Sequence, residues 1–298
     1  MISQTLVVPH GTLALQRHYE TESASDSQPM GRFSKLETGA QDSPAQAQAG
    51  AASAKNRGEA SPAQGPEYGY TYYAAEADKA FYSGAARRAL QLYSRAIQAD
   101  AAQVAPWIGQ ILCLLELQQP REAMVWVRRA LELFPEDPRL ISLRGAAYAH
   151  LGTVQQAIGC SDFALNLSGS DPVVWVLRGE ILTVAGSPNA AICFDKAMET
   201  RQHGDWQIPM LIGLACLRQK RWAQAADYLK RATQDFQGND HLWERLGHAQ
   251  EHLGLAQAAL ESYRAATHIN PQNQAAEEAI RRLTRTPFIV RWLRRLWK

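Results

Sequence analysis

Tryptophan residues recur along the chain at a fixed interval. Trp107, Trp175 and Trp243 are separated by 68 residues each, which is twice a period of 34. Periods of about 20–50 residues are typical of chains built from one supersecondary unit that stacks on copies of itself. Because such a unit cannot bury its apolar face alone, the period predicts an array of stacked units rather than a domain with one central core.

Other residues follow the same period. Small residues are expected where the two helices of a unit cross closely, and large residues where they fill the space between units. The best match begins at Asp240 and contains Trp243, Gly247, Gly254, Ala259, Tyr263, Ala266 and Pro271. The unit that begins at Pro172 is one residue shorter in its turn. The pattern predicts six units, at 70–103, 104–137, 138–171, 172–205, 206–239 and 240–273.

With these residues in phase, segment 70–273 resembles six tandem tetratricopeptide repeats (TPRs). The resemblance implies an all-α fold, a right-handed superhelical solenoid of paired antiparallel helices. The segment 274–285 (QAAEEAIRRLTR) predicts one further helix with a more polar outer face, which suits the cap that such arrays need.

The first 66 residues differ in composition from the rest. Segment 1–66 is rich in Ser, Gln, Ala, Gly and Pro, so it cannot bury enough apolar surface to offset its ordering entropy, and we expect it to be disordered. Residues 5–15 (TLVVPHGTLAL) are the exception, and either form a docking motif or are an apolar part of the tail. The N-terminus lacks the features of a secretory signal, and no apolar run is long enough to span a membrane, so a cytoplasmic location is expected.

Composition argues against several functional classes. The net charge of +2 gives no chain-wide field for nucleic acid. The four cysteines form no CxxC pair and are expected to be buried, reduced side chains. The sequence contains no phosphate-binding loop and no nucleophile elbow. We therefore predict a non-catalytic protein without a cofactor.

The family resemblance implies that partners bind on the concave surface, which the first helix of each unit lines. The candidate partner-binding residues are Ile108, Leu112, Leu115, Arg139, Leu143, Val176, Leu177, Glu180, Met210, Leu211, Leu214, Arg218, His241, Arg245, His248 and His252. This lining is apolar in its middle and charged at its C-terminal end. It lacks the Lys and Asn set of TPR proteins that clamp a C-terminal carboxylate. It is similar to that of TPR proteins which hold an apolar or amphipathic partner segment, such as the translocator chaperones of type III secretion. The alternative is that neighbouring units or the protein's own tail cover these residues.

One pattern in the last unit has the letters of a metal-binding motif. His248, Glu251 and His252 match HxxEH, and two imidazoles at i and i+4 of a helix can share a metal. A hydrolase of that class also needs a distant carboxylate ligand and a cleft. Since a regular repeat array offers a shallow trough instead, a polar contact surface is the preferred interpretation, and no metal site is predicted.

The chain ends in a basic amphipathic segment. Residues 286–298 begin with the helix-start pair Thr-Pro and carry an apolar stripe beside several basic residues. The candidate contact residues of this tail are Phe288, Arg291, Trp292, Arg294, Arg295 and Trp297. Such a segment either lies on an anionic membrane surface or packs its stripe on the last repeat or on a partner.

The leading hypothesis is therefore a protein-binding scaffold or adaptor, chaperone-like in character, whose groove holds an apolar or amphipathic segment of another protein. The alternative is a peripheral membrane-associated assembly factor that uses the C-terminal tail as its anchor.

Overall fold

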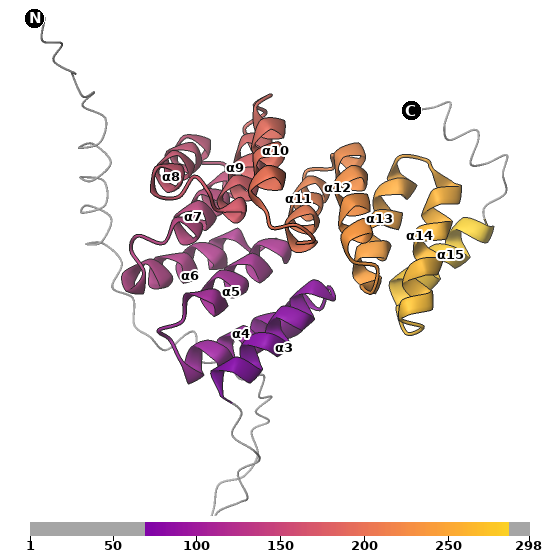
Figure 1. Cartoon of the computed structure of the whole chain (residues 1–298), viewed down its shortest axis with the longest axis horizontal. Helices are drawn as coiled ribbons and strands as arrows, with labels where there is room; N and C mark the ends of the chain where they lie inside the picture. Colours follow the sequence, from indigo (N-terminus) through magenta and orange to yellow (C-terminus); the bar gives the residue numbers. More distant parts are fainter. Residues whose placement is uncertain (1–68, 286–298) are drawn as a thin grey trace, which may run out of the picture. The chain divides into compact units, whose positions relative to one another are not determined.

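The computed structural model describes residues 69–285, which form thirteen α-helices without a strand in that range. All of these helices belong to one compact unit. The low-complexity segment 1–66, which includes residues 5–15, and the basic tail 286–298 lie outside the described residues. The described part confirms the all-α solenoid, in which consecutive helices pack on their neighbours in sequence (Figure 1).

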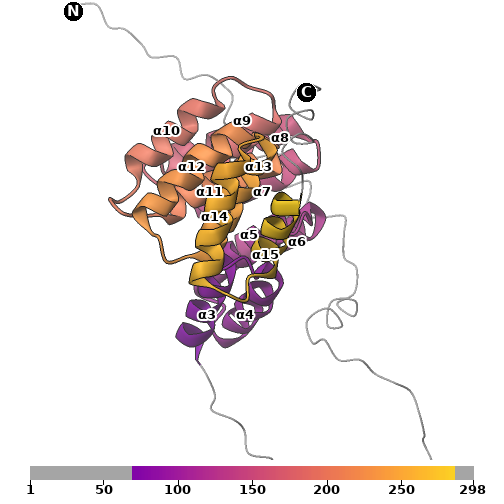
Figure 2. The ribbon, with the colours of Figure 1, turned by 90° about the vertical axis from the view of Figure 1, so that its right-hand side faces the viewer.

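The helices come in antiparallel pairs followed by one terminal helix. The pairs are α3 (Tyr70–Tyr82) and α4 (Ala86–Ala99), α5 (Val104–Glu116) and α6 (Pro120–Leu133), α7 (Pro138–His150) and α8 (Val154–Leu167), α9 (Pro172–Val184) and α10 (Ala190–Thr200), α11 (Gln207–Arg218) and α12 (Trp222–Asp235), and α13 (Asp240–His252) and α14 (Ala256–Ile269). The terminal helix is α15 (Gln274–Arg285), which packs on α14 and corresponds to the predicted cap (Figure 2).

The periodic tryptophans tie each unit to the turn that precedes it. The indole Nε1 of Trp107 donates a hydrogen bond to the Ala101 carbonyl at 3.1 Å. Trp175 donates in the same way to Gly169 at 2.8 Å, and Trp243 donates to a carbonyl six residues before it at 3.0 Å. The indole therefore fills space between units and also satisfies a carbonyl of the preceding turn, which explains the recurrence of tryptophan rather than of another aromatic residue.

Glycine allows the two helices of a unit to cross closely. A Cβ at Gly179 would lie 2.3 Å from the ring of Phe194, and a Cβ at Gly247 would lie 2.9 Å from the ring of Tyr263. In both units the large side chain of the second helix occupies the space that a side chain on the first helix would need. The small and large positions of the sequence period are thus the two sides of one helix crossing.

Helix starts are set by side-chain caps at three of the inner helices. The Asp137 carboxylate accepts from the backbone N–H of Arg139 and Leu140 at the start of α7, and Asp171 accepts from Val173 at the start of α9. Asn239 caps α13 through its Oδ1. Such caps satisfy backbone donors that have no partner inside the helix.

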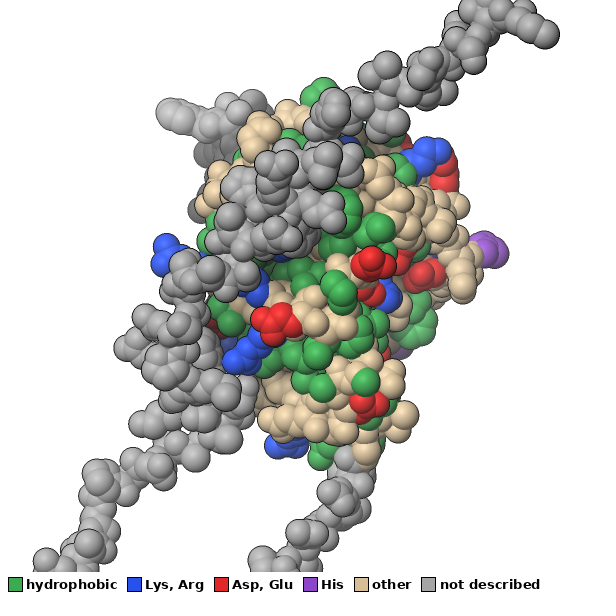
Figure 3. Space-filling model, turned by 90° about the vertical axis from the view of Figure 1, so that its left-hand side faces the viewer, with side chains coloured by type: hydrophobic (Ala, Val, Ile, Leu, Met, Phe, Trp, Pro, Cys, Tyr) green, Lys and Arg blue, Asp and Glu red, His purple; other side chains and the backbone are tan. Residues whose placement is uncertain are grey.

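Several large apolar side chains are exposed on the described helices. On the face shown in Figure 3, hydrophobic side chains lie among acidic and basic ones. Several of the large exposed apolar residues, such as Leu133, Leu167 and Ile269, are the last residues of the second helices of their pairs. Within residues 69–285, no helix has both the length and the apolar character required to cross a bilayer.

Candidate functional site

The apolar middle of the predicted groove is core rather than exposed lining. The side chains of nine of the sixteen candidate groove residues are buried, namely Ile108, Leu115, Leu143, Val176, Leu177, Glu180, Met210, Leu214 and His241. Ile108, Leu115, Leu143 and Leu177 belong to one packed cluster, and Val176, Met210 and Leu214 belong to another. The expectation of an exposed apolar trough was therefore wrong at these positions. The physical reason is that the first helices of successive pairs pack against one another as well as against their own second helices.

Among the other candidate residues, only His252 is exposed. The remaining six are half-buried, and they are Leu112, Arg139, Leu211, Arg218, Arg245 and His248. Most of these are polar or charged, so the accessible inner face is more polar than the sequence pattern suggests. A binding role for the candidate residues stays a prediction.

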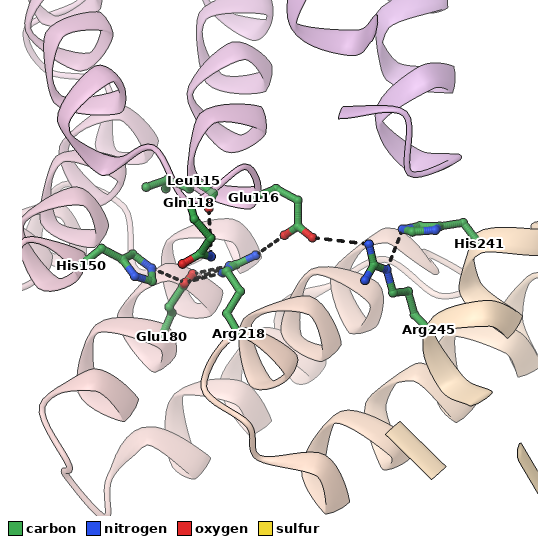
Figure 4. A network of polar contacts seen from close by, with 8 residues as sticks. All are labelled: Leu115, Glu116, Gln118, His150, Glu180, Arg218, His241 and Arg245. Carbon is green, nitrogen blue, oxygen red and sulfur yellow. Dashed lines mark hydrogen bonds and ion pairs between the residues drawn. The ribbon is translucent and has the colours of Figure 1, made fainter. Parts of the chain in front are cut away.

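A buried ion pair lies at the centre of the inner face. Glu180 on α9 is 1% exposed and accepts two hydrogen bonds from the Nη2 and one from the Nε of Arg218 on α11, at 2.8–3.0 Å. His150 on α7 lies 2.8 Å from the same carboxylate. Three successive inner helices are thus joined through one carboxylate (Figure 4).

The electrostatics of this pair follow from burial and charge together. Burial raises the pKa of Glu180, but the Arg218 charge and the His150 hydrogen bond lower it more, so that the pKa falls to about 2. Burial lowers the pKa of Arg218, whereas Glu180 and Glu116 raise it, and the net direction is upward. Both groups are therefore charged across the physiological range, as a buried pair with good hydrogen-bond geometry should be.

Glu116 extends this network across the inner face. Its carboxylate accepts a hydrogen bond from Nη1 of Arg218 at 2.6 Å, and its other oxygen lies 4.0 Å from Nη2 of Arg245. The Nε of Arg245 in turn donates to the ring of His241 at 3.2 Å. Because Glu116 ends α5 while the arginines lie on α11 and α13, the network joins helices that are far apart in the array (Figure 4).

A second contact joins distant units beside this network. The turn after α3 packs against the start of α13, where the Asn239 side-chain amide donates to the Tyr82 carbonyl at 2.9 Å across 157 residues. The Tyr82 ring packs edge-on against Trp206, with centroids 5.1 Å apart. Gly84, with a φ of +81°, lies so close to His241 that a Cβ would stand 2.4 Å from the imidazole. We refer to this contact, formed by Tyr82, Gly84, Trp206, Asn239 and His241, as the closing contact.

The HxxEH pattern is part of an aromatic group. His252 stacks on Trp222 of α12, with ring centroids 3.9 Å apart and planes 6° apart, and His248 packs edge-on against both rings. Burial, His252 and Arg245 together lower the pKa of His248, so this imidazole is neutral at pH 7. We call Trp222, His248 and His252 the aromatic patch.

The acidic residue of the same pattern is held elsewhere. Glu251 forms an ion pair with Arg282 of α15 at 2.7 Å and accepts a hydrogen bond from the Tyr263 hydroxyl. Throughout residues 69–285, no group of three or more His, Cys, Asp or Glu side chains is placed to hold a metal ion.

Family models and a curated relative match the described helices. Models described as tetratricopeptide repeat match residues 80–147, 185–240 and 210–274. Anaphase-promoting complex subunit 7 of Arabidopsis thaliana is 25% identical over 202 residues. This alignment covers 66% of the present chain and 35% of the plant protein, so the chain spans about a third of that relative's length.

Solved structures with similar helical arrays share little sequence with the chain. A thermophilic TPR protein of Thermus thermophilus is 16% identical with a TM-score of 0.46, over 60% of this chain and 98% of that one. The Cut9–Hcn1 hetero-tetramer of the APC/C gives 16% identity and a TM-score of 0.44, over 72% of this chain and 43% of the matched chain. From the repeat matches and the paired helices, the chain belongs to the tetratricopeptide-repeat family, whose members act as protein-interaction scaffolds and are generally not enzymes.

Proposed function

We propose that the protein is an adaptor that binds an amphipathic segment of another protein at the aromatic patch. The observation that carries this proposal is the stack of His252 on Trp222 at the accessible C-terminal end of the inner face. The apolar residues in the middle of the inner face are packed in the core, so they offer a partner little surface.

The chemistry of the patch suits a segment with both apolar and charged side chains. A half-buried indole with a neutral imidazole beside it gives a flat surface on which apolar or aromatic side chains can pack. Charged groups stand around it, because Arg245 precedes and Glu251 follows His248 on α13 and Arg282 reaches over from α15. An aromatic centre with a charged rim is the usual composition of a binding hot spot.

The similarity to a complex subunit supports an assembly role. The plant relative is, by its name, a subunit of a multi-protein complex, and 66% of the present chain aligns with it. We extend the proposal to an adaptor within an assembly. The chaperone-like character and the cytoplasmic location predicted from the sequence belong to the same proposal.

Paired tryptophan substitutions test this function. Trp222 and Trp126 are both half-buried and both lie on second helices of their pairs, α12 and α6. The full chain and its Trp222→Ala and Trp126→Ala variants are used as bait in native lysate, and partners are quantified by mass spectrometry. Loss of a hot-spot tryptophan costs about 2 kcal/mol or more, so we expect Trp222→Ala to lose partners that Trp126→Ala retains.

A correctly folded Trp222→Ala variant, checked by circular dichroism, that keeps all partners of the wild type would refute the proposed function. Loss of the same partners from both tryptophan variants would refute it equally, since the loss would then reflect general destabilisation.

A further inference from the structure

Glu116 lies between two arginines that come from other units. Its carboxylate is 2.6 Å from Nη1 of Arg218 and 4.0 Å from Nη2 of Arg245. The side chain of Glu116 is 20% exposed, and those of Arg218 and Arg245 are 14% and 31% exposed. The three side chains are therefore partly exposed to solvent, and Arg245 is the most exposed of them.

This contact is unusual for a solenoid, in which each repeat ordinarily contacts only its neighbours. Glu116 and Arg218 are separated by 102 residues, and the closing contact beside them spans 157. The carboxylate of Glu116 therefore approaches the inner face of α11 and α13 from across the array (Figure 4). Glu116 ends α5, in the second pair of helices, whereas the two arginines lie in the fifth and sixth pairs.

The charges of the two arginines are balanced differently. Arg218 is already paired with Glu180 through three hydrogen bonds, so Glu116 is its second carboxylate. Arg245 donates to the His241 ring and forms its ion pair with Glu116. Without Glu116, the two guanidinium groups would share a single carboxylate partner. That partner is Glu180, which contacts Arg218 rather than Arg245.

We propose that Arg218 and Arg245 form a recognition site for an acidic side chain of the partner segment, and that Glu116 occupies this site in the free protein. The inference rests on the proposed function, because it concerns the same inner face. Charge complementarity selects the occupant: two guanidinium groups directed at one point fit a carboxylate, and the protein's own carboxylate shows the geometry. An internal occupant reduces the apparent association constant to its intrinsic value multiplied by the fraction of molecules in which the site is free.

The test uses the full chain and a labelled peptide of three Ala-Glu-Leu-Ala blocks, with a matched peptide in which Gln replaces Glu. Binding is measured by fluorescence anisotropy for the wild type, Glu116→Gln, Glu116→Asp and Glu116→Gln/Arg245→Gln. We expect Glu116→Gln to bind the Glu peptide about ten-fold more tightly than the wild type. Glu116→Asp keeps the internal charge and should show little gain, and the double variant should lose the gain.

Three results overturn the proposal: no gain on Glu116→Gln, an equal gain for the Gln peptide, or a gain that persists after Arg245→Gln. If Glu116→Gln does not fold, the comparison of wild type with Arg245→Gln decides, and equal affinity for the Glu peptide in both refutes the site. Failure here with partners still lost on Trp222→Ala would leave the proposed function intact. If Trp222→Ala retains its partners while Glu116→Gln binds the Glu peptide about ten-fold more tightly, the proposed function fails and the recognition site for an acidic side chain stands.

Discussion

Substitution of Arg218 by Met should destabilise the protein strongly, because it leaves a buried charge without its main partner. Glu180 is 1% exposed, and its three hydrogen bonds to Arg218 would be replaced by an apolar side chain. His150 would remain at 2.8 Å. Breaking a buried pair by removing one partner costs about 3–5 kcal/mol, and we expect a loss of this size at pH 7.

The lowered pKa of Glu180 supports a similar contribution of the ion pair to the free energy of unfolding. Its lowering from 4.5 to about 2 corresponds to about 3 kcal/mol of stability. Because the folded-state pKa lies below the unfolded value, this contribution is fully present above about pH 5 and is lost as the pH falls toward 2. In Arg218→Met, burial dominates and raises the Glu180 pKa, so the carboxyl becomes neutral at a higher pH. The difference between the free energies of unfolding of wild type and variant should therefore narrow as the pH falls from the raised pKa of the variant toward 2, so that it is smaller at pH 4 than at pH 7.

Urea unfolding followed by circular dichroism at pH 7 and pH 4 measures both effects. The matched control is Arg231→Met, which removes an exposed arginine paired with Asp227 one turn away on α12. Exposed pairs of this kind contribute about 0–1 kcal/mol, so the control should change little. A loss for Arg218→Met below about 1 kcal/mol at pH 7, or a loss that does not shrink at pH 4, would refute the account of the buried pair.

Three further outcomes can be checked separately. Gly84→Ala should lower the melting temperature more than Gly152→Ala. Both glycines have positive φ, but only a Cβ at residue 84 would clash with His241. Equal losses in thermal melts would show that the closing contact contributes no stability. The Cys216 thiol should resist Ellman's reagent in the native protein, since burial raises its pKa to about 12, and fast labelling would contradict this. Deletion of residues 287–298 should abolish co-sedimentation with anionic liposomes if the tail is a membrane anchor, and unchanged sedimentation would dismiss that alternative.

The fold could be predicted from the sequence because its information is local and repeated. Trp107 bonds its inner helix to the turn before it, and the other periodic tryptophans repeat this contact. Gly179 lets its helix pack closely on Phe194 of the second helix in the same unit. These relationships recur at a fixed spacing, so one chain contains several instances of the same rule. The capping helix α15 followed from the same pattern.

The accessible surface could not be predicted in the same way. The sequence places Leu143 and Leu177 on inner helices, but their burial depends on how closely those helices pack on one another, which the period does not specify. Trp222 lies outside the tryptophan period, and its role depends on a contact with the next helix. The pairing of Glu116 with Arg218 joins residues 102 apart and has no local sequence signal.

The closing contact changes how the units of this array depend on one another. In an open array, stability is a sum of unit terms and nearest-neighbour interfaces, and loss of a terminal unit removes one interface. Here the amide of Asn239 and the ring of Trp206 hold the turn after α3, so the first unit also supports α11 and α13. The first pair of helices is therefore linked to the fifth and sixth pairs as well as to the second. Truncation at the N-terminal unit would be felt at both ends of the array, and unfolding should be correspondingly more cooperative.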